Sequence, residues 1–355
     1  INLSQGFPDF PVSEKLMDLV AKHMRAGHNQ YAPMPGVPEL REAISDKMDK
    51  LYSLKYDPEK EITITAGATQ AIFTAISALV NEGDEVIVFE PAYDCYVPAV
   101  EIHGGIPVFV KMNVSGSGPL INWDQVQKLM NQRTRMIIIN TPHNPSGRVM
   151  TAQDMLRLEK LTKGTDVVII SDEVYEHIIF DRAEHQSVAR YPNLANRAVI
   201  VDSFGKTYHN TGWKMGYVLA PEDLMKEFRK THQFNVFSVN TPVQHALAEY
   251  IQDDSLYLGL STFYQEKRDR FNALLRGSKF TIEPSAGTYF QLLGYGNISD
   301  EPDTEMAIRL TNEIGVASIP ISVFFHENHD QKLLRFCFAK EDSTLEQAAE
   351  KLCTL

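Results

Sequence analysis

Three stretches of the sequence decide the fold: MIIINTPHNP (residues 136–145), VVIISDEVY (residues 167–175) and VIVDSFGK (residues 199–206). Each begins with three or four consecutive Val, Ile or Met residues and ends in polar residues. Short, continuous apolar runs of this kind are typical of strands buried on both faces of a parallel sheet. We therefore predict a buried, mostly parallel sheet with polar residues at its strand ends.

The rest of the middle of the chain continues this pattern. Further apolar runs occur at residues 86–89, 107–110 and 217–220. Between the runs lie amphipathic stretches, with apolar residues three and four apart, at 68–79, 122–130 and 152–161. The alternation of strands and helices predicts an α/β fold with a mostly parallel, doubly wound sheet.

The pattern changes near residue 255. We expect a long charged helix at 256–275, strands at 280–282, 288–293 and 333–338, and a helix at 305–314. This order is typical of a smaller α+β domain. A chain of 355 residues is long enough for two domains. We predict a large domain formed by residues 30–255 and a small domain formed by residues 1–29 and 256–355.

Composition and charge argue against several classes of protein. The chain has 34 Lys and Arg against 46 Asp and Glu, a net charge of −12, whereas proteins that bind nucleic acids or anionic membranes need basic surfaces. No apolar run approaches the roughly 20 residues of a membrane span, and residues 1–9 lack the features of a signal peptide. Three scattered cysteines form neither a disulfide framework nor a metal-binding pair. We expect a cytoplasmic protein without a metal and with neither a nucleic acid nor a membrane as partner.

Polar side chains follow each of the three opening strands. Asn144 follows the first, Asp172 and Tyr175 end the second, and Ser203 and Lys206 end the third. Because ligands of doubly wound sheets bind beyond the carboxyl ends of the strands, we expect these side chains to share one edge. A lysine can form a Schiff base with a carbonyl compound, and a carboxylate favours a protonated pyridine nitrogen. Together they meet the requirements of pyridoxal phosphate chemistry.

A site for the phosphate is also predicted. The sequence GATQ (residues 67–70) opens the amphipathic stretch at 68–79. Free N–H groups at the start of a helix bind anions. Ser203 and Lys214 add a hydroxyl group and a positive charge. We therefore predict pyridoxal 5′-phosphate as the cofactor.

Taken together, these motifs resemble those of the class I and II, fold-type I pyridoxal-phosphate-dependent aminotransferases. The hallmarks of that family are similar to SFGKT (203–207) with KMG (214–216), to NTPHNPSG (140–147) and to SDEVY (171–175). Four further motifs resemble those of the kynurenine and methionine aminotransferase subgroup. They are QGFPDFP (5–11), NQYAPMPG (29–36), EPAYDCY (90–96) and RFCFAK (335–340). The resemblance covers essentially the whole chain. Relatives also carry a further N-terminal segment that the printed sequence does not contain.

The resemblance implies a role for each matching residue. Lys206 would hold the cofactor as a Schiff base and move a proton between substrate and cofactor. Asp172 would pair with the pyridinium nitrogen, and Tyr175 and Asn144 would hydrogen-bond the ring oxygen. Tyr93 would stack on the ring. The phosphate would be held by Ala68, Thr69, Ser203 and Lys214.

The substrate would meet a second group of residues. Arg335, Asn144 and Gly6 would bind its α-carboxylate, a task that suits the fork of the guanidinium group. Tyr31 would reach the cofactor site of a neighbouring subunit, which implies a homodimer. Many aminotransferases have an arginine at the position of Lys214, and a lysine there provides a point charge in place of a fork.

The expected activity is amino-group transfer from an L-amino acid (methionine, aromatic or kynurenine-like) to a 2-oxo acid by a ping-pong mechanism. Two alternatives stay open: a β-lyase acting on cysteine S-conjugates, and a non-catalytic regulator that binds pyridoxal phosphate. Tyr31, Tyr93 and Phe325 suggest an apolar or aromatic cleft, and no second arginine is evident for a dicarboxylate substrate. Taken singly, Asp172 is also a plausible helix cap, and Arg335 a plausible member of an internal salt bridge.

Overall fold

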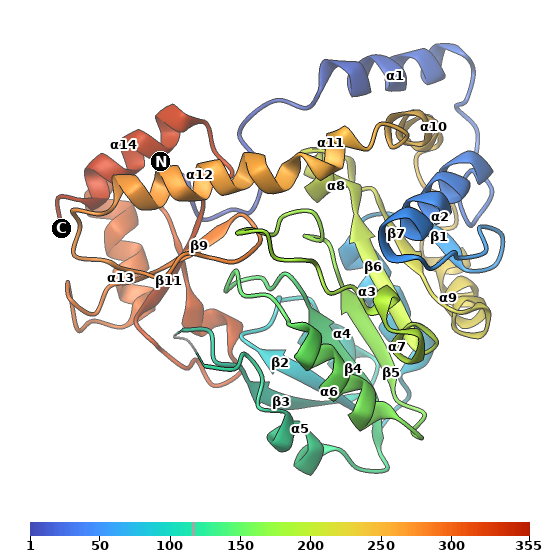
Figure 1. Cartoon of the computed structure of the whole chain (residues 1–355), viewed down its shortest axis with the longest axis horizontal. Helices are drawn as coiled ribbons and strands as arrows, with labels where there is room; N and C mark the ends of the chain where they lie inside the picture. The colour runs from blue at the N-terminus through green and yellow to red at the C-terminus, as the bar shows by residue number, and fades with distance from the viewer. Residues whose placement is uncertain (116–117) are drawn as a thin grey trace.

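The computed structural model describes residues 1–115 and 118–355. A seven-stranded sheet crosses the molecule in the order β1-β7-β6-β5-β4-β2-β3 (Figure 1). Strands β3, β2, β4, β5 and β6 are parallel, which confirms the mostly parallel sheet that was predicted. The strands are β1 (Ile62–Thr65), β2 (Glu85–Glu90), β3 (Ile106–Lys111), β4 (Thr134–Asn140), β5 (Val168–Asp172), β6 (Ala198–Ser203) and β7 (Gly216–Leu219).

Two strands depart from the parallel pattern. Strand β7, which contains most of the apolar run at 217–220, is antiparallel to both of its neighbours, β6 and β1. Strand β1 was not predicted, although all four of its residues are buried. Its sequence is ITIT, so Thr63 and Thr65 interrupt the apolar run that marks the other strands.

Helices cover both faces of this sheet, as expected for a doubly wound fold. Neighbouring residues of a strand point to opposite faces. In β4, Met136 and Ile138 pack with residues of α3 (Ala68–Leu79), α4 (Tyr96–Ile102) and α9 (Glu222–Asn235). Ile137 and Ile139 belong to the core on the other face, with residues of α5 (Trp123–Leu129) and α6 (Ala152–Thr162). The remaining helices of this part are α2 (Pro38–Tyr52), α7 (Pro192–Ala195), α8 (Phe204–Thr207) and α10 (Thr241–Tyr250).

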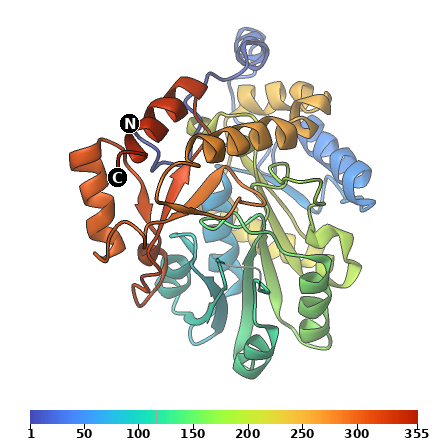
Figure 2. The ribbon, with the colours of Figure 1, turned by 60° about the vertical axis from the view of Figure 1, so that its left-hand side comes forward.

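A second sheet is antiparallel and has the order β10-β11-β9-β8. It contains β8 (Thr281–Ile282), β9 (Phe290–Gly294), β10 (Ile319–Pro320) and β11 (Leu333–Cys337). Helices α12 (Leu260–Leu274), α13 (Asp303–Arg309) and α14 (Asp342–Leu352) lie around it (Figure 2). The α+β content predicted for this part is therefore confirmed.

Two predicted helices differ in detail. The single helix expected at 256–275 is interrupted at Gly259, which separates α11 (Ser255–Leu258) from α12. Glycine has a low helix propensity, which favours a break there. The helix expected at 305–314 begins as α13 and ends in a π-helical turn, Leu310–Ile314.

The first residues join the second sheet, whereas α1 (Glu14–Arg25) packs on α10. The N–H group of Leu3 donates to the carbonyl oxygen of Ala317 at 3.1 Å. Lys22 and His23 of α1 pair with Glu249 of α10. Residues 1–29 therefore contact both parts of the molecule, and the division at residue 30 stays a prediction.

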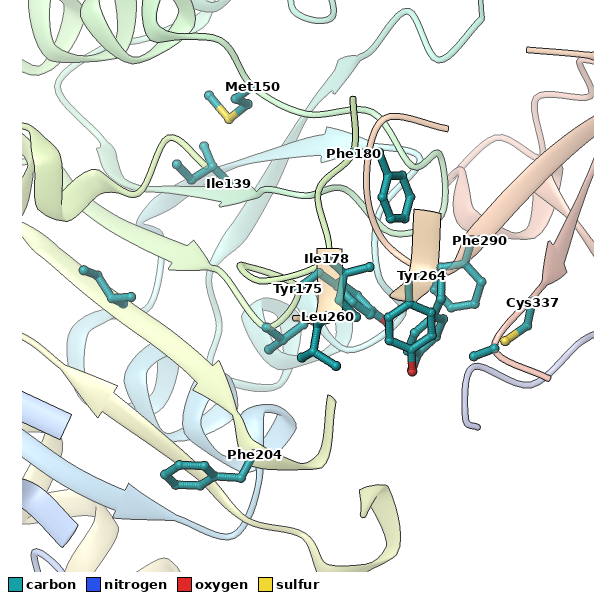
Figure 3. Close-up of a cluster of buried hydrophobic side chains, with 14 of the residues drawn as sticks. Ile139, Met150, Tyr175, Ile178, Phe180, Phe204, Leu260, Tyr264, Phe290 and Cys337 are labelled. Atoms are coloured by element: carbon teal, nitrogen blue, oxygen red, sulfur yellow. The ribbon is translucent and has the colours of Figure 1, made fainter. Parts of the chain in front are cut away.

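Buried aromatic side chains connect the two parts (Figure 3). Tyr175 follows β5, Tyr264 belongs to α12 and Phe290 to β9. The ring centroids of Tyr175 and Phe290 are 6.0 Å apart. These contacts hold β9 and α12 against the strand ends of the large sheet. In the part of the chain that the structure describes, no helix is both long and apolar enough to cross a membrane.

Candidate active site

A cavity of about 610 Å³ lies at the carboxyl ends of β4, β5 and β6. The start of α3, strand β11 and residues 319–324 complete its wall. This is the edge at which the polar side chains after the strands were predicted to meet. The predicted site residues that line the cavity are Gly6, Ala68, Thr69, Tyr93, Asn144, Asp172, Tyr175, Ser203, Lys206, Lys214 and Arg335.

Lys206 lies in α8, the single turn that follows β6. Its ammonium group donates to the carbonyl oxygen of Gly6 at 3.0 Å and to the hydroxyl oxygen of Tyr289 at 2.8 Å. The hydroxyl of Tyr289 donates to the same Gly6 oxygen at 2.6 Å. Burial, helped by the positive charge of Arg335, lowers the pKa of Lys206 to about 8. In an appreciable fraction of the molecules, Lys206 is therefore a neutral amine near pH 7, as a nucleophilic lysine requires.

Asp172 is the last residue of β5 and is buried. One carboxylate oxygen accepts a hydrogen bond of 2.5 Å from the hydroxyl of Tyr96. Burial raises the pKa of Asp172 to about 6, although the bond from Tyr96 acts in the opposite direction. Among the described residues, no cationic side chain forms an ion pair with Asp172. A carboxylate in this state favours a positively charged ligand beside it.

Tyr175 lies in the turn after β5 and its ring packs edge-on against that of Tyr289, with centroids 5.2 Å apart. The ammonium group of Lys206 lies 5.6 Å from the centre of the Tyr175 ring. Burial raises the pKa of Tyr175 well above its usual range. Its hydroxyl therefore stays protonated and remains a hydrogen-bond donor.

Arg335 lies on β11 and connects three segments of the chain. One Nη donates to Oδ1 of Asn144 at 2.8 Å, and the other donates to the carbonyl oxygen of Ser4 at 2.9 Å. Within residues 1–115 and 118–355, Arg335 has no acidic partner and its buried Nε has no hydrogen-bond partner. The alternative prediction that Arg335 forms an internal salt bridge is therefore wrong. The rings of Phe290 and Phe324 flank the guanidinium group at 4.1 and 5.3 Å.

The part of the cavity wall at the start of α3 is suited to hold an anion. Gly67, with φ +82°, precedes the first residue of α3, and the first N–H groups of a helix have no partner within the helix. The hydroxyl groups of Thr69 and Tyr93 are 3.1 Å apart. Lys214 and Ser203 line the same end. Backbone N–H groups, hydroxyl groups and an ammonium group together are suited to a phosphate.

Comparison with known proteins decides the family. Residues 1–352 match the sequence profile described as aminotransferase class I and II. The chain belongs to the class I and II aminotransferases. It is 49% identical over 353 residues to the methionine aminotransferase of Escherichia coli (strain K12), covering 99% of this chain and 91% of that protein. It is 33% identical over 389 residues to kynurenine–oxoglutarate transaminase 1 of Homo sapiens, covering 99% of this chain and 91% of that protein.

Solved structures of aminotransferases have the same fold. The Escherichia coli methionine aminotransferase superposes with a TM-score of 0.98 at 48% identity, over 100% of this chain and 94% of that chain. The N-succinyldiaminopimelate aminotransferase of Mycobacterium tuberculosis superposes with a TM-score of 0.96 at 35% identity, over 99% of this chain and 92% of that chain. These relatives are all aminotransferases, so the β-lyase and the regulator are not favoured.

Aminotransferases of this class use pyridoxal 5′-phosphate, and the cavity residues fit it. A Cβ atom at Gly67 would lie 3.5 Å from Nζ of Lys214, so the glycine leaves space at the end suited to a phosphate. Asp172 provides a buried carboxylate for the protonated ring nitrogen. Lys206 provides an amine with a lowered pKa. When bound, this cofactor withdraws electrons from the α-carbon of an amino acid.

Two residues named in the sequence analysis do not line the cavity of this chain, although Tyr31 was predicted to reach the site of a neighbouring subunit. The side chain of Tyr31 is 83% exposed and does not line the cavity of its own chain. Phe325, expected in the cleft, is buried with its ring 5.3 Å from that of His329. Its neighbour Phe324 lines the cavity instead, because successive residues of this segment point in different directions.

The sequence-based predictions missed the partners of the main site residues. Tyr96, which holds Asp172, lies in the motif EPAYDCY, but no spacing indicates that its hydroxyl faces a carboxylate. Tyr289, which contacts Lys206, lies in an expected strand with no signal for a polar role. The apolar wall formed by Ile319, Val323 and Phe324 was also missed.

Proposed function

We propose that this aminotransferase moves the amino group of an L-amino acid with an apolar or aromatic side chain to a 2-oxo acid by a ping-pong mechanism. Candidate donors are methionine, aromatic amino acids and kynurenine-like amino acids. The observation that carries the proposal is that Lys206, Asp172 and Arg335 line one cavity. They provide the amine, the carboxylate and the guanidinium group that the reaction needs.

In the proposed mechanism, Lys206 moves the proton at the α-carbon of the substrate. A pKa of about 8 allows it to take up and release a proton near neutral pH. Asp172 stays ionised and holds the ring nitrogen protonated. Tyr175 and Asn144 donate hydrogen bonds to the ring oxygen. Oδ1 of Asn144 accepts from Arg335, so Nδ2 of Asn144 is the atom that donates to the ring oxygen.

The remaining predicted residues have binding roles in this proposal. Tyr93 stacks on the ring, while Arg335, Gly6 and Asn144 hold the α-carboxylate of the substrate. Lys214 neutralises the phosphate as a point charge. Ala68, Thr69, Ser203 and Lys214 would hold the phosphate.

The preference for an apolar or aromatic donor rests on the wall beside Arg335. Ile319, Val323 and Phe324 form an apolar surface at this end of the cavity. Among the described lining residues, Arg335 is the one arginine, so a second carboxylate of the substrate has no guanidinium partner. Relatives that act on methionine and on kynurenine support the same preference.

We also propose a homodimer in which Tyr31 reaches the site of the partner. The ring of Tyr31 packs 5.4 Å from that of Phe237, and Phe234 nearby in sequence is 87% exposed. Exposed aromatic side chains are typical of interfaces. A large domain at 30–255, a small domain at 1–29 and 256–355, and a cytoplasmic location belong to the same proposal.

A single-turnover experiment tests the proposed reaction. The protein loaded with pyridoxal 5′-phosphate is mixed with each of the twenty amino acids, and loss of the visible absorption band is followed. We expect methionine and the aromatic amino acids to react faster than aspartate and glutamate. Lys206→Ala is expected to lose both the visible band and turnover, and retention of both would refute the proposal. Pyruvate released from a cysteine S-conjugate without added 2-oxo acid would instead indicate the β-lyase.

A further inference from the structure

His143 belongs to one of two loops that line the cavity and contacts the other loop, and none of the proposed roles uses it. It is 3% exposed. Its Nδ1 lies 2.7 Å from Oγ of Ser146, within its own loop at residues 140–148. Its Nε2 lies 3.0 Å from the carbonyl oxygen of Pro91, in the loop at residues 90–96. The imidazole ring therefore spans the space between the two loops.

The partners of His143 determine where its proton lies. A carbonyl oxygen accepts hydrogen bonds only, so Nε2 donates to Pro91. Burial lowers the pKa of His143 to about 3, which keeps the ring neutral near pH 7. Nδ1 is then an acceptor, and the hydroxyl of Ser146 donates to it. The N–H group of Arg148 donates to the same Ser146 oxygen at 3.2 Å, which orients the hydroxyl.

Each of the two loops contacts a main residue of the site. Directly after His143, Asn144 accepts the hydrogen bond from Arg335. At the end of the other loop, Tyr96, the first residue of α4, donates to Asp172. One loop therefore supports, through Asn144, the residue proposed to bind the substrate carboxylate, and the other supports, through Tyr96, the residue proposed to hold the ring nitrogen.

We propose that His143 is a positioning residue, which fixes the loop at 140–148 against the loop at 90–96 through the hydrogen bond from its Nε2 to Pro91. This inference rests on the proposed function, because it assigns His143 an effect on the groups that hold cofactor and substrate. A planar ring bonded at both nitrogens holds two loops at one separation. Because the two loops support groups that bind the cofactor and the substrate, a change in their separation should weaken the binding of both.

Two substitutions separate this hydrogen bond from simple packing. The amide group of His143→Gln extends about as far as Nε2 and can donate to Pro91. The shorter side chain of His143→Asn ends near the position of Nδ1 and loses that bond. His103→Gln and His103→Asn are matched controls, because Nδ1 of His103 contacts the carbonyl oxygen of Ala99 in its own helix at 2.7 Å. The readouts are the Kd of the apoenzyme for pyridoxal 5′-phosphate and the KM and kcat for methionine.

We expect His143→Asn to raise both the Kd and the KM about tenfold, with a smaller change in kcat, and His143→Gln to stay within about threefold of the wild type. Both His103 variants should match the wild type. Equal losses in the two His143 variants, or unchanged constants in His143→Asn, would overturn the proposal.

A measurement on the wild type does not depend on the folding of any variant. Selective ¹⁵N labelling of histidine should place the proton of His143 on Nε2 from pH 5 to pH 8. A proton on Nδ1 would contradict the proposal. If the wild type itself fails to bind pyridoxal 5′-phosphate, the proposed function fails as well, whereas normal binding with an unaffected His143→Asn variant refutes only the role of His143.

Discussion

The hydroxyl group of Tyr96 donates a 2.5 Å hydrogen bond to the carboxylate of Asp172. Both side chains are buried. Tyr96 begins α4 and Asp172 ends β5, so the bond joins a helix on one face of the sheet to the edge where the cavity opens. Burial raises the pKa of Asp172 to about 6, and this bond limits the rise by favouring the ionised form.

Replacing Tyr96 by Phe removes the donor and leaves the ring in place. The pKa of Asp172 should then rise further above 6, because the ionised carboxylate loses a stabilising partner. Pyridoxal 5′-phosphate needs the ionised form, so its binding should be lost at a higher pH in Tyr96→Phe than in the wild type. At pH 7 we expect roughly tenfold weaker binding, about 1.4 kcal/mol. A titration of Kd against pH checks this, and identical pH midpoints would contradict it.

Attachment of the cofactor to the apoenzyme should depend on the pKa of Lys206. Only the neutral amine attacks a carbonyl, so the rate should rise with pH and reach half its maximum near pH 8. Arg335→Gln removes a positive charge that lowers this pKa, and the midpoint should move to higher pH. Stopped-flow absorbance between pH 6.5 and 9.5 measures both. A rate that does not change with pH would show that another step limits attachment.

Gly67 offers a test of the anion-binding end. Its φ is +82°, and a Cβ atom there would lie 3.4 and 3.5 Å from Cε and Nζ of Lys214. With ψ at 167°, Gly67 has a backbone conformation that is essentially restricted to glycine, so Gly67→Ala should weaken phosphate binding about tenfold and cost about 1–3 kcal/mol in backbone strain. Gly164→Ala is the matched control, because Gly164 has φ +76° and no atom of the described residues lies within 4 Å of a Cβ placed there. We expect the Tm, measured by calorimetry, to fall for both variants, and the Kd for pyridoxal 5′-phosphate to change only for Gly67→Ala.

The buried ion pair of Lys47 and Glu176 should contribute to stability. Lys47 of α2 contacts Glu176, which follows Tyr175 in the turn after β5, and the side chains are 5% and 2% exposed. Lys47→Met leaves the carboxylate without its cation, a change that typically costs about 3–5 kcal/mol. The Tm should therefore fall markedly. The double variant Lys47→Met/Glu176→Gln should recover part of the loss, and a double variant less stable than Lys47→Met would contradict this account.

The strand ends were the most predictable part of the site. Parallel strands bring their carboxyl ends to one edge, so Asn144, Asp172 and Lys206 could be placed together from three apolar runs. The direction of the strands was harder to predict from the sequence. The run at 217–220 resembles the others, yet β7 is antiparallel, because direction depends on the connection that precedes a strand and not on its composition.

Contacts between distant residues were beyond prediction. Tyr96 lies 76 residues before Asp172, and Tyr289 lies 83 residues after Lys206. Nothing local distinguishes these tyrosines from those that only fill the core, since packing alone decides which hydroxyl meets which partner. For the same reason, the predicted strand at 333–338 contained Arg335 but gave no indication of its partner, Asn144.

The hydrogen bond from Arg335 to Ser4 joins residues 331 positions apart. Lys206 and Asp172, by contrast, come from the middle of the chain. During synthesis, the lysine and the phosphate-binding residues therefore leave the ribosome well before the guanidinium group that grips the substrate. Of the parts of the site, the group proposed to bind the amino acid is synthesised last. A chain shortened from its C-terminal side would lose that grip while still containing every residue proposed to hold the cofactor.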